Sequence, residues 1–309
     1  MIMKKLLIVC GLALIGMQNT FAQNEDTWVP QQLGIGVGVG TTGIVIDAST
    51  TLNRWLGVRA GVDIVPKIKV NTDLDLGTQG LNEDFQDMTR RAEAINAAAG
   101  RTIIDLSGLP NGLPSSMDVQ GKLSNTTFHF LVDVYPFKSS SFHATTGFYI
   151  GGKEVVSVYN RKNGFLEPIT QWNEAVLHPN TLPAAAQQYV ENQSIIGAEL
   201  GDYFITPDPD DKGNTKATIE VSGFRPYLGV GFGRAVPRHA RFACQFDMGV
   251  QFWGTPKVYA PTYDKETKTY QRQQLTDDHA GGDGGDVLKV ISKIAVYPTL
   301  NFRLVGRIL

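Results

Sequence analysis

The feature that most constrains this chain is a strict alternation of apolar and polar residues, which recurs in one segment after another. In 241–253, even positions from Phe242 to Phe252 carry mostly large apolar side chains, and odd positions carry small or polar ones. Segments 55–65 and 128–136 alternate in the same way. Because successive side chains of a β-strand point to opposite faces, this period of two predicts strands with one apolar and one polar face.

The pattern predicts eight strands in all, provided that residues 41–42 form a turn. A single long strand from Leu33 to Ser49 is the alternative that the residues leave open. The eight predicted segments are 33–40, 43–52, 55–65, 128–136, 142–158, 217–233, 241–253 and 294–307.

The connections between these segments differ in length, which predicts an orientation. Segments 53–54, 138–141 and 235–239 are short, whereas 67–117, 161–216 and 255–293 are long. If these strands form an outer-membrane barrel, in which periplasmic turns are short and extracellular loops are longer, the long segments are expected outside the cell. They are also the expected contact surfaces for an extracellular ligand, which the sequence does not identify.

The long loops are expected to contain short helices. Asn82 is a suitable N-cap for a helix whose apolar stripe includes Phe85 and Ile95, and Gly100 is suited to end it. Pro183 is expected to begin a second short helix. Segment 286–296 fits a helix that leads directly into the last strand.

The first 22 residues read as an export signal. Lys4 and Lys5 form a basic start, an apolar stretch follows, and Thr20 to Ala22 resembles a cleavage site. The apolar stretch, roughly 12 residues long, is too short to cross a bilayer as a helix. We therefore expect residues 1–22 to be a signal peptide and 23–309 a single domain. Its one remaining cysteine, Cys244, leaves no partner for an internal disulfide.

The apolar faces of the predicted strands are expected to meet lipid and the polar faces to point inward. The apolar faces carry large aromatics such as Phe128, Phe242 and Phe246, which suit a membrane barrel better than a soluble sandwich. The interior of an eight-stranded barrel is just wide enough for side chains to fill it. We therefore expect an interior charge network with a structural role, made of Asp47, Arg59, Asp63, His129, Asp133, Arg225, Asp247, Arg303 and Arg307.

The segments LGIGVGVGTTG, RPYLGVGFG, FDMGVQFWGTPKV and YPTLNFRLVGRIL resemble strands of the small eight-stranded outer-membrane β-barrels of the OmpA and OmpX type, including those of Bacteroidetes. The resemblance implies an all-β fold, a closed antiparallel transmembrane barrel with long extracellular loops. It also implies a Gram-negative cell envelope, insertion by the barrel-assembly machinery, and contact with outer-membrane lipid and lipopolysaccharide.

Some segments resemble ligand-binding motifs but are interpreted as ordinary strands, turns or loops. Residues 38–43 spell a dinucleotide fingerprint, but a predicted strand follows where a phosphate-binding helix is required. The acidic clusters at 208–214 and 277–286 are expected to be solvated loops, with a weak divalent-cation site as the alternative. The formal net charge of −2 gives no electrostatic reason to expect nucleic acid.

The sequence thus favours an outer-membrane barrel with a structural or surface-interaction role and a filled polar interior. Two alternatives remain, a small-solute channel and a lipid-modifying enzyme. A lipid-modifying enzyme would need a nucleophile with a histidine and an acid in register near the lipid face, and no such spacing is present. We therefore expect no catalytic residues and no cofactor.

Overall fold

The computed structural model describes residues 32–75, 82–108, 116–137, 139–162, 164, 166–238 and 240–308. The expected signal peptide, residues 1–22, lies outside this range. None of the helices in the described part of the chain is long and apolar enough to span a bilayer.

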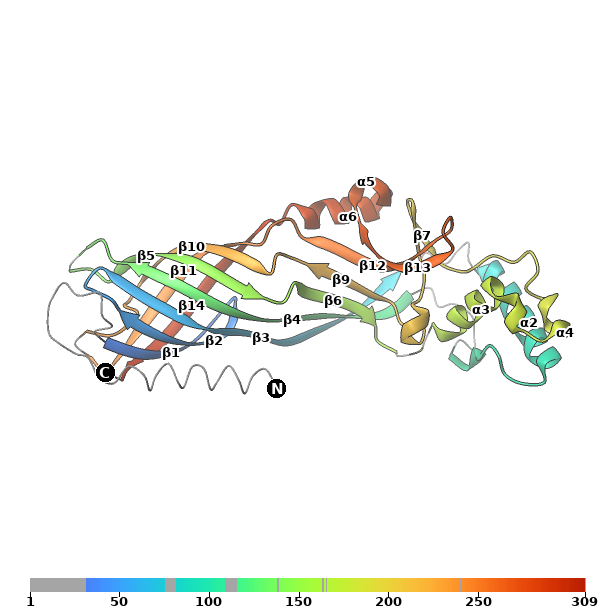
Figure 1. Ribbon diagram of the computed structural model, residues 1–309, viewed down its shortest axis with the longest axis horizontal. Helices are drawn as coiled ribbons and strands as arrows, with labels where there is room; N and C mark the ends of the chain where they lie inside the picture. Colours follow the sequence, from blue (N-terminus) through green and yellow to red (C-terminus); the bar gives the residue numbers. More distant parts are fainter. Residues whose placement is uncertain are drawn as a thin grey trace.

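Eight antiparallel strands form a hydrogen-bonded ring at one end of an elongated molecule (Figure 1). Their order is β3-β2-β1-β14-β11-β10-β5-β4, and β4 pairs back with β3 to complete the ring. All eight predicted segments contribute a strand. The strands are β1 (Gln32–Gly40), β2 (Gly43–Thr51), β3 (Leu56–Asp75), β4 (Ser116–Val134), β5 (Phe142–Gly151), β10 (Phe224–Phe232), β11 (Phe242–Phe252) and β14 (Val296–Arg307).

The expected turn at Thr41–Thr42 is present, so β1 and β2 are separate strands that form a hairpin. The connections at 52–55, 135–141 and 233–241 lie together at the end of the ring where the chain's C-terminus also lies (Figure 1). The three long connections leave from the opposite end.

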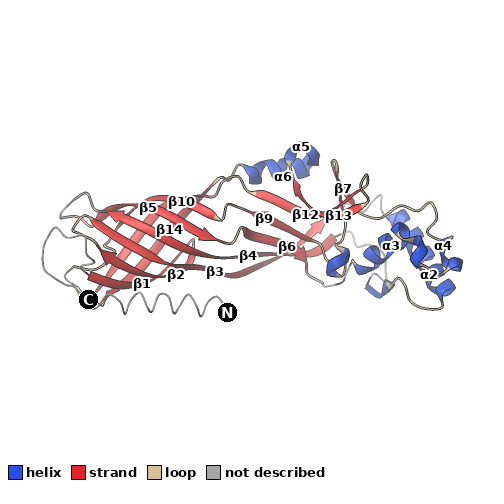
Figure 2. Ribbon diagram, in the orientation of Figure 1, coloured by secondary structure: helices blue, strands red, loops and turns tan. Residues whose placement is uncertain are grey.

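The prediction that 67–117, 161–216 and 255–293 are loops was wrong in part, because strands extend far into them. β3 runs on to Asp75 and β4 begins at Ser116, beyond the last rung that β3 shares with β2. Further strands continue the sheet above the ring as an open extension (Figure 2). They are β6 (Glu154–Asn160), β7 (Ala198–Leu200), β8 (Tyr203–Ile205), β9 (Lys216–Glu220), β12 (Lys257–Asp264) and β13 (Thr269–Leu275).

Two predicted strands, 142–158 and 217–233, are each broken in two. Residues 152–153 separate β5 from β6, and residues 221–223 separate β9 from β10. In both cases one half belongs to the ring and the other to the extension. In 217–233 the apolar positions change from odd (Ile219, Val221) to even (Leu228, Val230) across the break, so the prediction of one continuous strand overlooked a change of phase.

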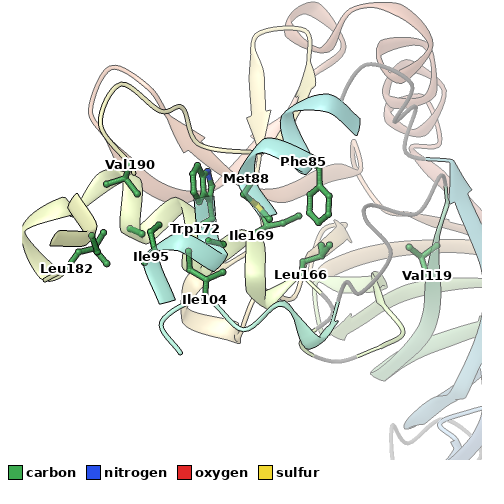
Figure 3. Packing of buried hydrophobic residues seen from close by; sticks show 13 residues of the cluster. Phe85, Met88, Ile95, Ile104, Val119, Leu166, Ile169, Trp172, Leu182 and Val190 are labelled. Carbon is green, nitrogen blue, oxygen red and sulfur yellow. The ribbon is translucent and has the colours of Figure 1, made fainter. Parts of the chain in front are cut away.

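A helical cap lies at the far end of the extension (Figure 1), and its buried apolar side chains are shown in Figure 3. The predicted stripe of α2 is confirmed: Phe85 and Ile95 are buried beside Trp172, and Gly100 follows the helix at a φ of +64°. Val119 of β4 joins the same core and so attaches the cap to the sheet. The cap contains α2 (Asn82–Ala99), η1 (Leu106–Gly108), α3 (Glu167–Leu177), η2 (Pro179–Thr181) and α4 (Ala184–Gln187), which follows Pro183 as predicted.

A smaller core lies beside β12. Leu288 packs there with Tyr203 and Leu275. The surrounding elements are α5 (Asp277–Ala280) and α6 (Gly282–Ser292), and α6 leads into β14 as predicted for 286–296. The short helix η3 (Pro209–Asp211) lies against α3 of the cap.

The outward and inward faces of the sheet exchange polarity between the ring and the extension. In the ring, outward residues such as Ile64 and Phe128 are exposed and apolar, and their inward neighbours Asp63 and His129 are buried. Aromatic side chains gather near both ends of the outward face. The ring centroids of Phe142 and Phe232 are 5.5 Å apart at one end, and those of Phe148 and Phe224 are 5.4 Å apart at the other.

Above the ring, the pairing register places apolar residues on the face that continues the interior. Ile68 is opposite Leu123, Leu123 is opposite Val156, and Val156 is opposite Ile219. The neighbouring row on the outward face is polar and consists of Lys69, Lys122, Ser157 and Thr218.

The inner face of the extension meets both of the smaller cores. Val119 and Val158 pack in the core of the cap, and Val258 packs against the core beside β12. These three residues are covered by other parts of the same chain, whereas Ile68 and Leu123, nearer the ring, are 46% and 39% exposed.

Candidate functional site

The inward side chains of the ring meet in one buried cluster of charges. Each strand contributes every second residue to the interior, so the residues converge from several different strands. Seven of the nine residues expected in the interior belong to this cluster: Asp47, Arg59, Asp63, His129, Asp133, Asp247 and Arg303, all less than 5% exposed.

Arg59 forms the centre of one half of the cluster. Its Nη1 donates to Asp247 Oδ2 at 2.9 Å, and its Nη2 donates to Asp133 Oδ1 at 2.7 Å. Thr145 Oγ1 also donates to Asp133 Oδ1, at 2.8 Å, and His143 Nε2 lies 2.8 Å from Asp247 Oδ1. One guanidinium therefore neutralises two carboxylates, each of which has a further hydrogen-bond partner.

His129 and Arg303 form the other half. His129 Nδ1 lies 2.5 Å from Asp63 Oδ2, and His129 Nε2 lies 3.9 Å from Asp47 Oδ2. Thr42 Oγ1 donates to Asp63 Oδ1 at 2.7 Å. Arg303 donates to Asp47. The hydroxyl and the guanidinium thus each satisfy a carboxylate oxygen that is removed from water, whereas Asp47 Oδ2 has no hydrogen-bond partner among the described residues.

Gln245 joins the two halves. Its Oε1 accepts from Arg303, and its Nε2 lies 3.4 Å from Asp133 Oδ2. The cavity beside Asp47, His129 and Arg303 has space for about one water. Side chains therefore fill the described middle of the ring, as expected for eight strands.

Gly36 of β1 makes room for the Arg303 guanidinium. A Cβ at this position would lie 2.7 Å from Arg303 Nε and 2.7 Å from Asp47 Oδ1. Any larger residue would displace the ion pair, so at least one glycine of the first strand serves close packing of the interior.

The sequence prediction was wrong about the partners of Arg225 and Arg307. Arg225 is buried but donates to the backbone carbonyls of Ser222 and Gly152, at 2.8 and 2.6 Å. Arg307 is half-buried and donates to the carbonyl of Arg238 at 2.7 Å. Both lie at the ends of their strands, where free carbonyl groups are closer than the central acids.

Several interior residues were missed in the predicted set. His143 and Thr145 of β5 are buried in the cluster, and Tyr149 stacks edge-on against Tyr227 with 5.6 Å between ring centroids. Tyr135 points inward as well, and its hydroxyl accepts from the Ala235 backbone N–H at 2.7 Å. The same odd-numbered alternation along 143–149 marks these positions as inward, so the pattern was sufficient to find them.

Asp133, His143 and Asp247 offer ligand atoms that all lie within 4.8 Å of one another. Arg59, however, is hydrogen-bonded to both carboxylates and occupies the place that a cation would take. The arrangement is therefore an ion-pair network. In the acidic segment 208–214, Asp208 accepts from the Asp210 backbone N–H at 2.9 Å. This local turn accounts for one of the carboxylates that suggested a cation loop.

Segment 38–43 does not have the structure of a dinucleotide site. Its glycines belong to the β1–β2 hairpin, and strand β2 follows where the motif requires a helix.

Comparisons with known proteins return solved structures only. No protein-family model matches the chain, and no curated protein matches it. Crystal structures of CarO and CarO2 from Acinetobacter baumannii share 11% and 12% identity, with TM-scores of 0.39 and 0.41. The alignments cover 92% and 90% of this chain and 99% of each of those chains.

A major outer membrane protein from Thermus thermophilus shares 11% identity at a TM-score of 0.38. That alignment covers 89% of this chain and 98% of the other. At these identities and TM-scores, the function of this chain has to be argued from its own residues.

Proposed function

We propose that this chain is an outer-membrane β-barrel protein that anchors an extracellular extension and a helical cap at the cell surface. The observation that carries the proposal is the polarity of the ring, with an apolar outward face and a buried charge network inside. A soluble barrel has the opposite arrangement.

The height of the apolar outward face fits the hydrocarbon core of an outer membrane. Phe242 and Phe252 lie at the two ends of the outward face of β11, and both are exposed. Ten residue steps correspond to about 33 Å along a strand, or about 25 Å after a tilt of roughly 40°. The aromatic groups near both ends of the ring fit the two interfaces of such a band.

The cap supports a role in surface interaction. It has its own core, and its buried polar groups are satisfied: Trp172 Nε1 donates to the Ser194 carbonyl at 3.2 Å, and Asn173 bonds both backbone groups of Ile196 at 2.7 and 2.8 Å. The extension holds this structured cap away from the ring (Figure 2). We therefore propose the cap, and not the ring, as the region that meets an extracellular partner.

A non-enzymatic role is part of the proposal. His129 and His143 are at most 1% exposed, and neither hydrogen-bonds to a serine hydroxyl in the described part of the chain. Both are therefore positioned to stabilise the interior and not to reach an acyl chain at the lipid face.

Two measurements test the proposal. The full chain should fractionate with outer membranes, and its band should migrate differently on gels with and without heating. Recovery of a detergent-free monomer from periplasmic extract would overturn the membrane assignment.

Conductance in planar bilayers separates the filled interior from a small-solute channel. We expect no stable open state for the unmodified protein. The matched variant Arg59→Ser/Asp133→Ser/Asp247→Ser removes the central ion pairs and should conduct if it folds. Stable conductance of the unmodified protein would favour the channel.

A further inference from the structure

Two lysines are directly opposite each other just above the ring. Lys69 of β3 and Lys122 of β4 are register partners, so their Cβ atoms lie on one face about 5 Å apart. They occupy the outward face, because the adjacent pair Ile68 and Leu123 continues the interior. Lys69 is exposed and Lys122 is half-buried.

This arrangement is electrostatically unfavourable without an anion, because like charges directly opposite each other destabilise a strand pair. Neither ammonium pairs with a carboxylate among the described residues. Glu154 is within electrostatic reach of Lys122. Its carboxylate, however, bonds Lys216 at 3.0 Å and Ser157 Oγ at 2.5 Å.

Protection of a sheet edge explains only one of the two lysines. Beyond the ring, β3 has β4 as its single neighbour, and Pro66, Lys67 and Lys69 are typical of an edge that resists pairing with other chains. Lys122 lies on β4, which pairs with β3 on one side and β6 on the other at this level. A lysine there needs another explanation.

Below the lysines, the outward face changes from charged to polar to apolar, in the same order as a lipid from its headgroup to its acyl chains. Ser124 and Thr126 follow Lys122 on the outward face of β4, and Phe128 and Phe130 come next, both exposed. The four residue steps from Lys122 to Thr126 correspond to about 10 Å along the membrane normal for a strand tilted by roughly 40°. A lysine side chain spans much of that distance, so both ammonium groups can reach the level of a lipid headgroup.

From this geometry we propose that Lys69 and Lys122 bind a phosphate group of lipid A in the outer leaflet. The acyl chains of the same molecule lie against Phe128 and Phe130. The inference rests on the proposed outer-membrane function and assigns that function a lipid site. Lipid A combines the required groups, a phosphorylated sugar headgroup above several acyl chains.

The test is a titration of the full-length protein in detergent with fluorescent bis-phosphorylated lipid A. The variant Lys69→Gln/Lys122→Gln should bind about 30-fold more weakly, because each basic residue near a lipid headgroup contributes about fivefold. The control Lys212→Asn/Lys268→Asn removes the same charge from two exposed turns of the extension, where asparagine suits the positive φ of both positions. The control should bind within about twofold of the unmodified protein.

Dephosphorylated lipid A identifies the group that is recognised. It should bind the unmodified protein and the Lys69/Lys122 variant equally. Unchanged binding of bis-phosphorylated lipid A by that variant would overturn the inference, as would an equal loss in the control. Competition by inorganic phosphate at the same concentration as lipid A would overturn the assignment to a lipid.

Membrane fractionation and heat-dependent gel migration, measured on the same proteins, separate this inference from the proposed function. If the proteins fractionate with membranes but the variant binds normally, only the lysine site is wrong. If they do not enter the membrane, the proposed function fails first.

Discussion

The ring and the extension share two strands, β3 and β4, and these strands present opposite polarities to their surroundings in the two regions. In the ring, β3 and β4 present Ile64 and Phe128 outward and Asp63 and His129 inward. A few residues further on, Lys69 and Lys122 face outward and Leu123 faces the interior side. On the proposed outer-membrane assignment, this exchange of polarity marks the level at which lipid gives way to water.

The two regions also differ in what fills their interiors. The inward side chains of the ring form ion pairs. Its apolar side chains occupy the outward face and so do not form an internal core. The extension and the cap use apolar cores such as that around Trp172. The following four substitutions test this contrast, beginning with the largest effect.

Arg59→Ala should destabilise the ring by about 4–5 kcal/mol, because it leaves the buried carboxylates of Asp133 and Asp247 without their guanidinium. Urea unfolding in lipid vesicles, followed by tryptophan fluorescence, measures the change. Arg241→Ala, at an exposed position just before β11, should change the free energy of unfolding by less than about 0.5 kcal/mol. Equal stabilities of the two variants would show that the interior ions do not stabilise the ring.

Trp172→Ala should cost the cap about 4 kcal/mol, since it removes the largest side chain of the cap core. Limited proteolysis should then cut within 82–108 or 166–196 while the ring keeps its heat-dependent migration. Glu191→Ala, an exposed cap position, is the control. Loss of the ring's migration in the Trp172 variant would mean that the two regions unfold together.

Met248→Arg places a charge at the middle of the outward face of β11 and should cost about 3 kcal/mol in a bilayer. Asn71→Arg places the same charge on the outward face of the extension, where we expect a cost below about 1 kcal/mol. Unfolding in vesicles measures both variants. A similar cost at both positions would contradict the assignment of lipid to the ring alone.

Lys216→Ala should have the smallest effect, below about 1 kcal/mol, because its ion pair with Glu154 is largely exposed. Burial alone would raise the pKa of Glu154, but the Ser157 hydroxyl and the Lys216 ammonium together lower it. The stabilisation is therefore present above the ordinary glutamate pKa of about 4.3 and is lost as the pH falls through the lowered pKa. Unfolding at pH 7 and at pH 3 should show a difference between variant and unmodified protein only at pH 7.

The sequence predicted the ring well because a half-buried strand carries its own signal. Each segment alternates, and the parity that places Asp133 and Asp247 inward is readable without a structure. Helix α2 of the cap was also visible from Phe85, Ile95 and their flanking Asn82 and Gly100, whereas α3 was not predicted.

The extension could not be predicted in the same way. Around Lys67 and Lys69 the exposed face is charged, as in a loop, and only pairing with β4 makes the segment a strand. The partners of Arg225 and Arg307 were equally hidden. Alternation predicts the face on which a residue lies but not its position along the axis of the ring. That position determines whether a carboxylate or a backbone carbonyl is the nearest acceptor for an arginine.

The irregularity between Val65 and Ile68 has a further consequence. Ile64, Ile68 and Val70 are all even-numbered, and if β3 continued regularly through these residues, without the irregularity, they would line a single column on the outward face. That column would be about 20 Å longer on the membrane side, at ~3.3 Å per residue. On the proposed membrane assignment, this irregularity therefore ends the lipid-facing apolar column of β3 at Ile64 and fixes the level of the bilayer surface on that strand.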